Sequence, residues 1–429
     1  MTHRKPELLS PAGTLRNMRY AFAYGADAVY AGLPRYSLRV RNNDFREENM
    51  AERIAEAHGL GKQFFVAVNV MPHGAKLRTF VQDMEPVVAM GPDAFIMADP
   101  GLIMLVRERW PELPVHLSVQ ANTTNAAAVR FWRSVGVSRV ILSRELSLEE
   151  IADIRQECPD TELEVFVHGA LCIAYSGRCL LSGYFNHRDA NQGTCTNACR
   201  WEYQIGSDAA EGPGGAARHP AADGVYYIEE KQRPGEFMPV FEDEHGTYIM
   251  NSRDLRAVEH VERLVEIGVD CLKIEGRTKS HYYTARTAQV YRQAIDDAVA
   301  GRPFREQLMA ELEGLANRGY TDGFFQRHAS DELQNYREGA SRTRGTQFVA
   351  EVTGSDERSG LVELEAKNKF FRGDTLQLIT PAGNRRFVLD VVEDLDGNAL
   401  DEVPGGGWRV RVAIPGDRAE MGLVTRETT

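Results

Sequence analysis

The chain passes from strand to loop at Glu164-Val-Phe-Val-His-Gly-Ala-Leu-Cys172. The β-branched and aromatic residues of this run predict a buried strand. The loop that follows carries four of the six cysteines, spaced C-x6-C-x15-C-x3-C: Cys172, Cys179, Cys195 and Cys199. Four thiols on one loop leave three explanations open at this point, namely an iron–sulfur cluster, a zinc ion, or unreactive cysteines of the core.

Seven further β-rich runs accompany this strand, and all eight alternate with helical segments. Eight strands that alternate with helices predict an α/β fold, a (β/α)8 TIM-like barrel. The predicted strands are 7–13, 28–32, 64–69, 94–99, 115–120, 140–145, 163–168 and 271–276.

The predicted helices end in a repeated pattern, with a glycine placed just before the next strand. Such a glycine supplies the left-handed residue that ends a helix. The pattern recurs at Gly25, Gly91, Gly136 and Gly268. A doubly wound open sheet has the same local units, so closure into a barrel is predicted from the strand count alone. After the eighth strand, helical spacing predicts one buried face: Tyr283, Thr287, Val290, Ala294 and Ala298.

A large insertion follows the seventh strand, since roughly a hundred residues separate it from the eighth, far more than an ordinary βα loop. The insertion holds the cysteine loop, 172–199, and a Gly-, Ala- and Pro-rich segment, 206–223, that predicts a flexible surface excursion. Pro234-Gly235 and 242–246 predict a hairpin. We assign residues 1–337 to the barrel domain.

The pattern of apolar and polar residues changes after this domain. From Gln347 onward, short runs alternate apolar and polar residues with period two and are separated by Gly, Asn and Pro turns. The predicted strands are 348–352, 361–365, 375–379, 386–390 and 408–412. This pattern predicts a small all-β C-terminal domain, an antiparallel β-barrel over 346–429. The polar stretch 338–345 is the predicted boundary.

The composition narrows the class of protein. Six cysteines in 429 residues are too few for a disulfide scaffold, so the cysteine cluster indicates a metal or catalytic site. We find neither an apolar run long enough to span a bilayer nor an apolar leader, which predicts a cytoplasmic protein without a membrane partner. With a net charge of −12, the chain as a whole does not attract nucleic acid, so any contact with nucleic acid must rest on local basic patches.

The predicted strands end in polar residues, where catalytic groups of such barrels lie. Arg39 and Arg41 follow the second strand two residues apart and would point the same way in extended chain, an arrangement that suits carboxylate or phosphate capture as well as simple surface ion pairs. Glu275 and Arg277 end the eighth strand, where anion sites of these barrels often lie. The other polar residues at strand ends are Asn69, Asp99, Gln120, Asn122, Arg144, Glu145 and His168.

The spacing of the loop cysteines favours one of the three explanations. Structural zinc sites pair their cysteines with two to four intervening residues, which fits Cys195 and Cys199 but not Cys172 and Cys179. A [4Fe–4S] cluster is therefore favoured over zinc. Unreactive core positions suit Cys158, near a helix end, and Cys271, inside a strand.

A basic patch is predicted in the C-terminal domain. Lys367, Lys369 and Arg372 lie near the aromatic pair Phe370-Phe371, a combination that suits RNA and equally a solvated lysine-rich turn. Walker A, G-x-G-x-x-G, H-E-x-x-H and G-x-S-x-G motifs are absent from the sequence.

These motifs together resemble a known family. The run 164–172, continued by Gly177-Arg-Cys179-Leu-Leu-Ser182, resembles the signature of the collagenase-like peptidase family, a "U" group of unassigned catalytic type. The resemblance covers almost the whole chain except 206–223. It also includes Pro6-Glu-Leu-Leu-Ser-Pro-Ala-Gly13, Tyr24-Gly-Ala-Asp-Ala-Val-Tyr-Ala-Gly32, Asn191-Gln-Gly-Thr-Cys-Thr-Asn-Ala-Cys-Arg-Trp201 and Lys273-Ile-Glu-Gly-Arg-Thr-Lys279.

The resemblance implies a function despite the peptidase name. The similar branch modifies RNA with an iron–sulfur cluster, forming 5-hydroxyuridine at the wobble position of tRNA from prephenate and without molecular oxygen. The cluster ligands implied here are Cys172, Cys179, Cys195 and Cys199. We add the hypotheses that His168 or Glu145 moves protons and that the two carboxylates of prephenate are bound by Arg39, Arg41, Arg144 and Arg277. The other predicted substrate-binding residues are Gln120, Asn122 and Glu275.

The sequence thus predicts a cytoplasmic tRNA hydroxylase with tRNA and prephenate as partners and leaves room for an electron donor. Two alternatives remain, a metal-dependent peptidase and a non-catalytic RNA-binding protein with structural zinc. Iron and sulfide content separates a cluster from zinc.

Overall fold

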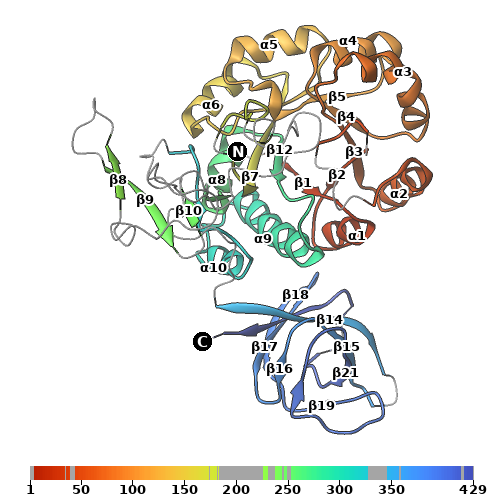
Figure 1. Ribbon diagram of the computed structural model, residues 1–429, viewed down its shortest axis with the longest axis vertical. Helices are drawn as coiled ribbons and strands as arrows, with labels where there is room; N and C mark the ends of the chain where they lie inside the picture. The colour runs from red at the N-terminus through yellow and green to blue at the C-terminus, as the bar shows by residue number, and fades with distance from the viewer. Residues whose placement is uncertain are drawn as a thin grey trace, which may run out of the picture.

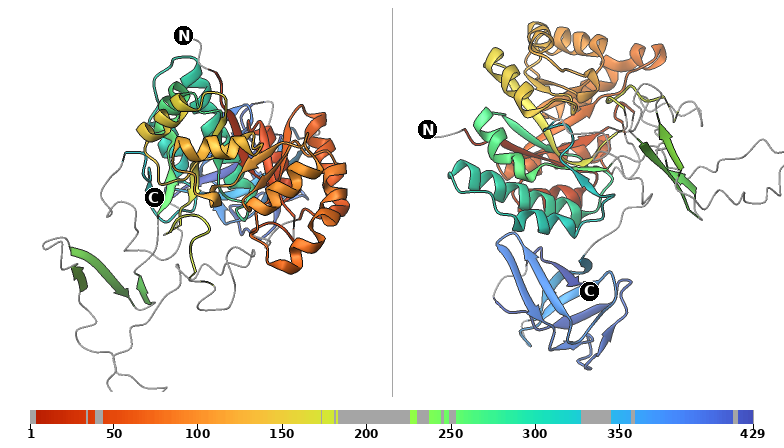
Figure 2. Two further views of the ribbon diagram at one scale, coloured as in Figure 1. Left: turned by 90° about the horizontal axis from the view of Figure 1, so that it is seen from above. Right: turned by 90° about the vertical axis from the view of Figure 1, so that its left-hand side faces the viewer.

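A computed structural model gives the architecture of the chain (Figures 1 and 2). It describes residues 4–33, 35–38, 44–172, 174–180, 182, 253–326, 345–356, 359–416 and 420–428, together with the backbone of three strands between 226 and 248.

Eight parallel strands form a closed barrel in the order β12-β1-β2-β3-β4-β5-β6-β7, and β7 pairs back with β12. The (β/α)8 prediction is therefore confirmed. The strands are buried on both faces, which matches their apolar sequences. Their bounds are β1 (Glu7–Pro11), β2 (Ala28–Gly32), β3 (Gln63–Val68), β4 (Ala94–Met97), β5 (Val115–Leu117), β6 (Arg139–Ile141), β7 (Glu162–Ala170) and β12 (Cys271–Ile274).

Helices surround the barrel (Figure 1). The repeated glycines Gly25, Gly91, Gly136 and Gly268 all have positive φ, between 72° and 108°, as expected of residues that end helices. The predicted face after the eighth strand is buried in α9 (His281–Val299). No helix in the described ranges is both long and apolar enough to cross a membrane. The other helices are α1 (Leu15–Ala23), α2 (Glu47–Gly59), α3 (Gly74–Ala89), α4 (Pro100–Arg109), α5 (Ala126–Ser134), α6 (Leu148–Glu157), α8 (Val261–Ile267) and α10 (Gln307–Glu313).

The insertion after β7 adds a separate sheet and the strand β11, and β13 follows later in the chain, after α10. β8 (Tyr226–Glu229), β9 (Phe237–Asp243) and β10 (Gly246–Tyr248) form a separate antiparallel sheet, which contains the predicted hairpin (Figure 2). β11 (Asp254–Arg256) pairs antiparallel with the outer part of β7, and β13 (Tyr320–Thr321) pairs with β11. The predicted excursion 206–223 lies outside the described residues.

The C-terminal domain is antiparallel β structure, as predicted (Figure 1). Its main sheet has the order β18-β17-β22-β14-β15-β21-β19. The sequence analysis missed β22 (Leu423–Glu427), although this strand lies between β17 and β14 and pairs with both. The other strands are β14 (Thr346–Ser355), β15 (Val362–Ala366), β16 (Phe370–Phe371), β17 (Thr375–Thr380), β18 (Gly383–Val388), β19 (Val392–Glu393), β20 (Glu402–Val403) and β21 (Arg409–Val412).

The two domains meet along α1 and α9 (Figure 1). The Tyr24 hydroxyl donates to the backbone oxygens of Ile379 and Met421, both at 2.9 Å. The ring of Tyr282 stacks on Phe348 with centroids 4.7 Å apart. Apolar residues of both domains share one core, so the domains are packed rather than loosely tethered.

A carboxylate of the C-terminal domain is also held at this boundary. Glu351 is buried and pairs with Arg16 and His281 of the barrel, His281 at 2.9 Å, and with Lys367 of its own domain at 2.9 Å. Burial alone would raise the pKa of this carboxyl, but its hydrogen bonds and the neighbouring cations lower the pKa well below the usual range. Glu351 is therefore an ionised link between the domains at neutral pH.

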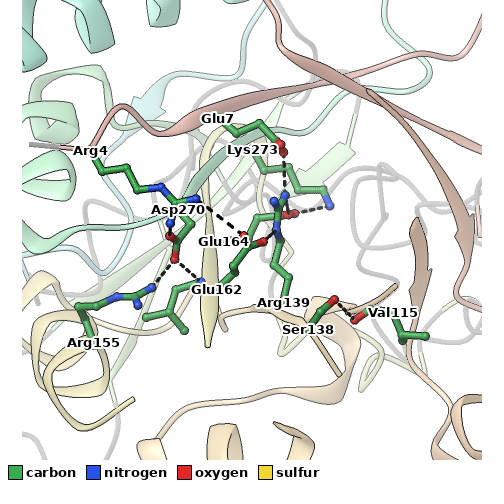
Figure 3. A network of polar contacts seen from close by, with 11 residues as sticks. Arg4, Glu7, Val115, Ser138, Arg139, Arg155, Glu162, Glu164, Asp270 and Lys273 are labelled. Carbon is green, nitrogen blue, oxygen red and sulfur yellow. Dashed lines mark hydrogen bonds and ion pairs between the residues drawn. The ribbon is translucent and has the colours of Figure 1, made fainter. Parts of the chain in front are cut away.

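Four charged residues meet inside the barrel and connect β1, β6, β7 and β12 (Figure 3). Lys273 Nζ lies 2.7 Å from Glu164 Oε1, and both side chains are almost fully buried. Arg139 lies 2.7 Å from Glu7 and 3.5 Å from Glu164. Burial raises the pKa of the Glu7 carboxyl, and the Arg139 guanidinium offsets part of that rise. We call Glu7, Arg139, Glu164 and Lys273 the ion cluster.

The ion cluster yields a stability prediction. Replacing Lys273 by Met leaves Glu164 buried without its main partner, which we expect to cost about 3–5 kcal/mol in the free energy of unfolding. Urea unfolding followed by circular dichroism measures this loss.

The matched control is Lys5→Met, because Lys5 pairs with Asp296 at 2.8 Å on the surface, where both side chains are about half exposed. Breaking an exposed pair costs at most about 1 kcal/mol. Equal losses in the two variants would contradict a stabilising role for the buried pair.

Candidate functional site

The polar residues that follow the strands lie at one end of the barrel, since all eight strands are parallel. Strands β6 and β12 stop at Ile141 and Ile274, earlier than predicted. Arg144, Glu145 and Glu275 therefore stand in the loops of the mouth rather than in the strands.

A row of cations and aromatic rings runs below the mouth, across β7, β12 and β2. The Arg144 guanidinium lies 4.6 Å from the Phe166 ring centroid, and Lys273 Nζ lies 5.3 Å from the same centroid. Lys273 Nζ is 4.5 Å from the Tyr30 centroid, and the Arg277 guanidinium is 5.9 Å from it. We call these five residues the cation–aromatic row. Lys273 is paired with Glu164, so the two arginines are the cations of this row that favour an anionic ligand at this end of the barrel.

Arg277 is fixed in place by neighbouring loops. Its guanidinium donates to Ser37 Oγ at 2.6 Å and to the backbone oxygen of Leu38, whose own amide donates to Asn69 Oδ1 at 3.1 Å. A Cβ on Gly32 would lie 2.3 Å from Arg277 Nη1, so a glycine is needed there. Arg39 and Arg41, which follow directly, lie outside the described residues, and their predicted role stays a prediction.

Arg144 and Asn122 both reach the beginning of the cysteine loop. Arg144 donates to the backbone oxygen of Ala170 at 2.7 Å and to Ser176 Oγ at 3.2 Å. Asn122 Nδ2 donates to the backbone oxygens of Gln120 at 2.8 Å and Ser176 at 3.1 Å. The loops after β5 and β6 therefore hold the turn that lies between the first two loop cysteines.

The first two loop cysteines are free thiols, Cys172 exposed and Cys179 half-buried. Soft, accessible thiols beside the barrel mouth fit an iron–sulfur or zinc ligand role. Cys195 and Cys199 lie outside the described residues, so half of the predicted ligand set is placed. In the part of the chain that is described, no three His, Cys, Asp or Glu side chains gather into a metal site.

The other two cysteines behave as core residues, as predicted. Cys158 and Cys271 are buried, and burial raises the pKa of the Cys271 thiol well above its usual value. A thiol that resists ionisation is a poor nucleophile and a poor metal ligand.

His168 lies against α9 and β13. Its ring centroid is 5.7 Å from Tyr283, 5.6 Å from Tyr291 and 5.5 Å from Tyr320. Burial lowers the pKa of His168 to about 3, and its Nε2 atom has no hydrogen-bond partner among the described residues. The next residue must be glycine, because a Cβ on Gly169 would lie 2.4 Å from the Glu275 backbone oxygen. At neutral pH this imidazole is uncharged and tightly packed.

The remaining mouth residues fall into two groups. Asp99 caps α4 by accepting from the Leu102 amide at 2.9 Å, so its carboxylate has a structural partner. Gln120 and Glu275 are buried, and Gln120 Oε1 accepts from Ser118 Oγ at 3.2 Å. Glu145 is half-buried and accepts a hydrogen bond from the neighbouring Ser143 hydroxyl. Of these carboxylates, Glu145 is placed at the mouth with partial solvent access.

The predicted RNA-binding residues divide between two environments. Lys367 pairs with Glu351 at the domain boundary, and Phe370 is fully buried in the core. Lys369 and Arg372 are about half exposed, and Lys369 Nζ lies 4.9 Å from the Phe371 ring centroid. The exposed part of the predicted patch is therefore Lys369, Phe371 and Arg372.

A polar cavity of about 250 Å³ lies beside β11 and β13, and sequence reasoning did not single it out. Its lining carries both charge signs: Arg253, Arg256, Glu259, Tyr320, Thr321 and Asp322. Mixed charge gives this cavity no preference for an anion, in contrast to the cation–aromatic row.

The family can now be stated from the comparisons. Residues 13–335 match Peptidase family U32, and residues 344–426 match the Peptidase family U32 C-terminal domain. The chain belongs to peptidase family U32. The resemblance drawn from the motifs is confirmed.

Several relatives of this U32 chain have names that refer to the modification of RNA. It is 61% identical over 430 residues to tRNA hydroxylation protein P from Escherichia coli, covering 96% of this chain and 94% of that protein. A protein of the same name from Haemophilus influenzae is 57% identical, with 97% and 95% covered. A 23S rRNA 5-hydroxycytidine synthase from Escherichia coli is 30% identical, with 78% of this chain and 46% of that protein covered.

The sequence analysis of this U32 chain overlooked Lys273, Phe166 and Tyr30. Lys273 carried a usable signal, because a lysine inside Cys271-Leu-Lys-Ile274 is unexpected in a parallel strand buried on both faces. Phe166 and Tyr30 carried none, since aromatic residues are ordinary components of buried strands.

The burial of His168 predicts a pH-dependent loss of stability. At pH 7 the imidazole is neutral in both the folded and unfolded states. Below about pH 6.5 the unfolded chain binds a proton that the folded chain, with a pKa of about 3, does not bind. Stability therefore falls as the pH falls, by about 2 kcal/mol at pH 5 from this residue.

Urea unfolding of the wild type and His168→Gln at pH 7 and pH 5 measures this contribution, and the variant should show a shallower loss. The control is His58→Gln, since His58 is exposed on α2. An unchanged pH dependence in His168→Gln would contradict the neutral, buried state.

Proposed function

We propose that this chain is an RNA-modifying hydroxylase that forms 5-hydroxyuridine at the wobble position of tRNA. Relatives named for tRNA hydroxylation match it over nearly the full length of both chains. A relative named for an rRNA 5-hydroxycytidine synthase shares the same chemistry on another pyrimidine. Hydroxylation of RNA is the activity that these names have in common.

We base the choice of co-substrate on the cation–aromatic row. Arg144 and Arg277 bring two positive charges to the mouth end of β7 and β2, while Lys273, which lies on the same rings, is paired with Glu164. Guanidinium groups bind carboxylates in two-pronged fashion, and aromatic faces accept a flat ring. Prephenate, which has two carboxylates and a six-membered ring, matches this chemistry.

The cluster would be held by Cys172 and Cys179, with Cys195 and Cys199 completing the set. The exposure of Cys172 and the position of both described thiols beside the mouth support this assignment. A bound [4Fe–4S] cluster supplies electron transfer or a Lewis-acidic iron close to the substrate. An electron donor and a cytoplasmic location belong to the same proposal.

In this proposal Glu145, rather than His168, transfers protons. A group that moves protons works best with a pKa near the working pH, and the pKa of about 3 removes His168 from that range. Glu145 is half-buried at the mouth with a hydroxyl partner in Ser143. His168 instead packs β7 against α9.

Access to the uracil ring sets a requirement on the RNA. C5 lies on the edge of the base, so the base must stand outside a stacked helix, as anticodon bases can. Phe371 of the C-terminal domain offers an exposed stacking surface for the same tRNA. Lys369 and Arg372 beside it are half exposed and pair with Glu402 and Asp401, so contacts with RNA phosphates would replace these exposed ion pairs.

The central test of the function is nucleoside mass analysis of tRNA. A deletion strain should lack 5-hydroxyuridine derivatives, wild-type protein should restore them, and Cys172→Ala should not. Cys158→Ala is the matched control, because Cys158 is a buried core cysteine and its variant should restore the nucleoside. Unchanged 5-hydroxyuridine in the deletion strain would reject the tRNA assignment.

The nature of the metal is tested separately. Protein purified without oxygen should be brown and contain iron and sulfide. Colourless protein with zinc would instead support the non-catalytic RNA-binding alternative, and hydrolysis of peptides would support the peptidase alternative.

The prephenate assignment predicts the behaviour of Arg277→Met. Losing a charged contact that ground state and transition state share should raise the KM for prephenate at least about tenfold and change kcat little. Steady-state assays of reconstituted protein on tRNA measure both constants. Arg302→Met is the control, because the Arg302 side chain is exposed and its partner Asp297 keeps a second pair with Arg305. An unaltered KM for prephenate would place its binding site elsewhere.

A further inference from the structure

We propose that Arg144, Asn122 and Ser176 form a clamp that positions the first two cluster cysteines. We call these three residues the rim clamp. The inference rests on the proposed function, because it assigns Cys172 and Cys179 to the cluster. It gives Arg144 and Asn122 a task in addition to substrate binding, namely to fix the turn that carries both thiols.

The first arm of the rim clamp comes from the loop after β6. Arg144 Nη1 donates to the Ala170 oxygen at 2.7 Å, and Nη2 donates to Ser176 Oγ at 3.2 Å. The same guanidinium lies on the Phe166 ring at 4.6 Å. One planar group thus bridges the last residue of β7 and the middle of the cysteine turn, which a lysine cannot reproduce.

The second arm comes from the loop after β5. Asn122 has φ 52° and ψ 51°, and it is one of two non-glycine residues with positive φ in the described ranges. Asparagine tolerates this left-handed conformation better than most residues. The conformation lets Nδ2 donate both to the Gln120 oxygen and to the Ser176 oxygen. A strained residue that holds a loop is expected at a functional site.

Both arms meet on one residue. Ser176 is buried. Its Oγ atom accepts a hydrogen bond from Arg144, and its backbone oxygen accepts one from Asn122. The turn is closed by the Arg178 amide, which donates to the Tyr175 oxygen at 3.0 Å. Ser176 stands four residues after Cys172 and three before Cys179, so fixing it limits the positions open to both thiols.

This arrangement has a physical consequence for ligand binding. Thiols that are already placed lose less conformational freedom when a metal centre binds, and partners behind the ligands commonly change metal affinity by 10–100-fold. The rim clamp should therefore raise the retention of the cluster without contacting it.

Three variants remove different bonds of the clamp, one bond with Ser176→Ala and two bonds each with Asn122→Gly and Arg144→Lys. Ser176→Ala removes the acceptor of Arg144 and keeps the backbone oxygen that accepts Asn122. Asn122→Gly keeps positive φ accessible and removes the amide. Arg144→Lys keeps the charge and removes the planar bridge. Ser134→Ala is the matched control, since the Ser134 hydroxyl bonds only locally to Phe131 on exposed α5.

Two measurements on the full-length protein test the clamp. The first is hydrogen–deuterium exchange of the metal-free protein over 170–180. We expect about fivefold faster exchange in Ser176→Ala, the effect of losing one hydrogen bond, and a larger increase in the two variants that lose two bonds. The second is iron and sulfide retained after reconstitution and desalting, where we expect about tenfold faster loss. Combining Ser176→Ala with Arg144→Lys should add little to Arg144→Lys alone, because that change already removes the bond to Ser176 Oγ.

The outcomes separate the clamp from the function. Unchanged exchange in all three variants would overturn the clamp. Faster exchange with unchanged iron retention would overturn its role in positioning the cysteines. If the variants lose iron as expected while the deletion strain keeps its 5-hydroxyuridine, the clamp stands and the proposed RNA function fails.

Discussion

The buried pair between Glu164 and Lys273 is the contact on which the barrel depends. β12 must find β7 after an insertion of roughly a hundred residues, and both strands are largely apolar. Apolar contacts alone would tolerate a slipped register, but a slip of one residue would turn Lys273 away from Glu164 and leave two buried charges unpaired. The 2.7 Å contact therefore specifies where the barrel closes.

The same pair links the stability of the barrel to its mouth. Lys273 contacts Glu164 on one side and the rings of Phe166 and Tyr30 on the other. Because Arg144 and Arg277 lie on those same rings, the ion cluster and the cation–aromatic row share one residue. Charges that close the fold also fix the positions of the arginines at its open end.

The sequence predicts the fold well because the fold depends on repeated local signals. Strand composition and the glycines that end helices mark each βα unit, and the count of eight gives the barrel. β22 escaped prediction because Leu423–Glu427 pairs only with residues distant in the chain.

The site was harder to predict. The position of His168 after a strand indicated a mouth residue, but the irregular pairing of β7 with β12 places its ring against the tyrosines of α9. Ser176 gave no signal, because its role comes from bonds across 32 and 54 residues.

Charge sets a limit on how the proposed RNA substrate is recognised. The chain has a net charge of −12, and at physiological salt a charge is felt over about 8 Å. The cations of the mouth therefore act only at short range, and Lys273 is already paired with Glu164. Long-range steering of a polyanion is weak under these conditions, in contrast to strongly basic RNA-binding proteins. Recognition then depends on contacts made after encounter, by the exposed patch of the C-terminal domain and by an unstacked base at the barrel mouth.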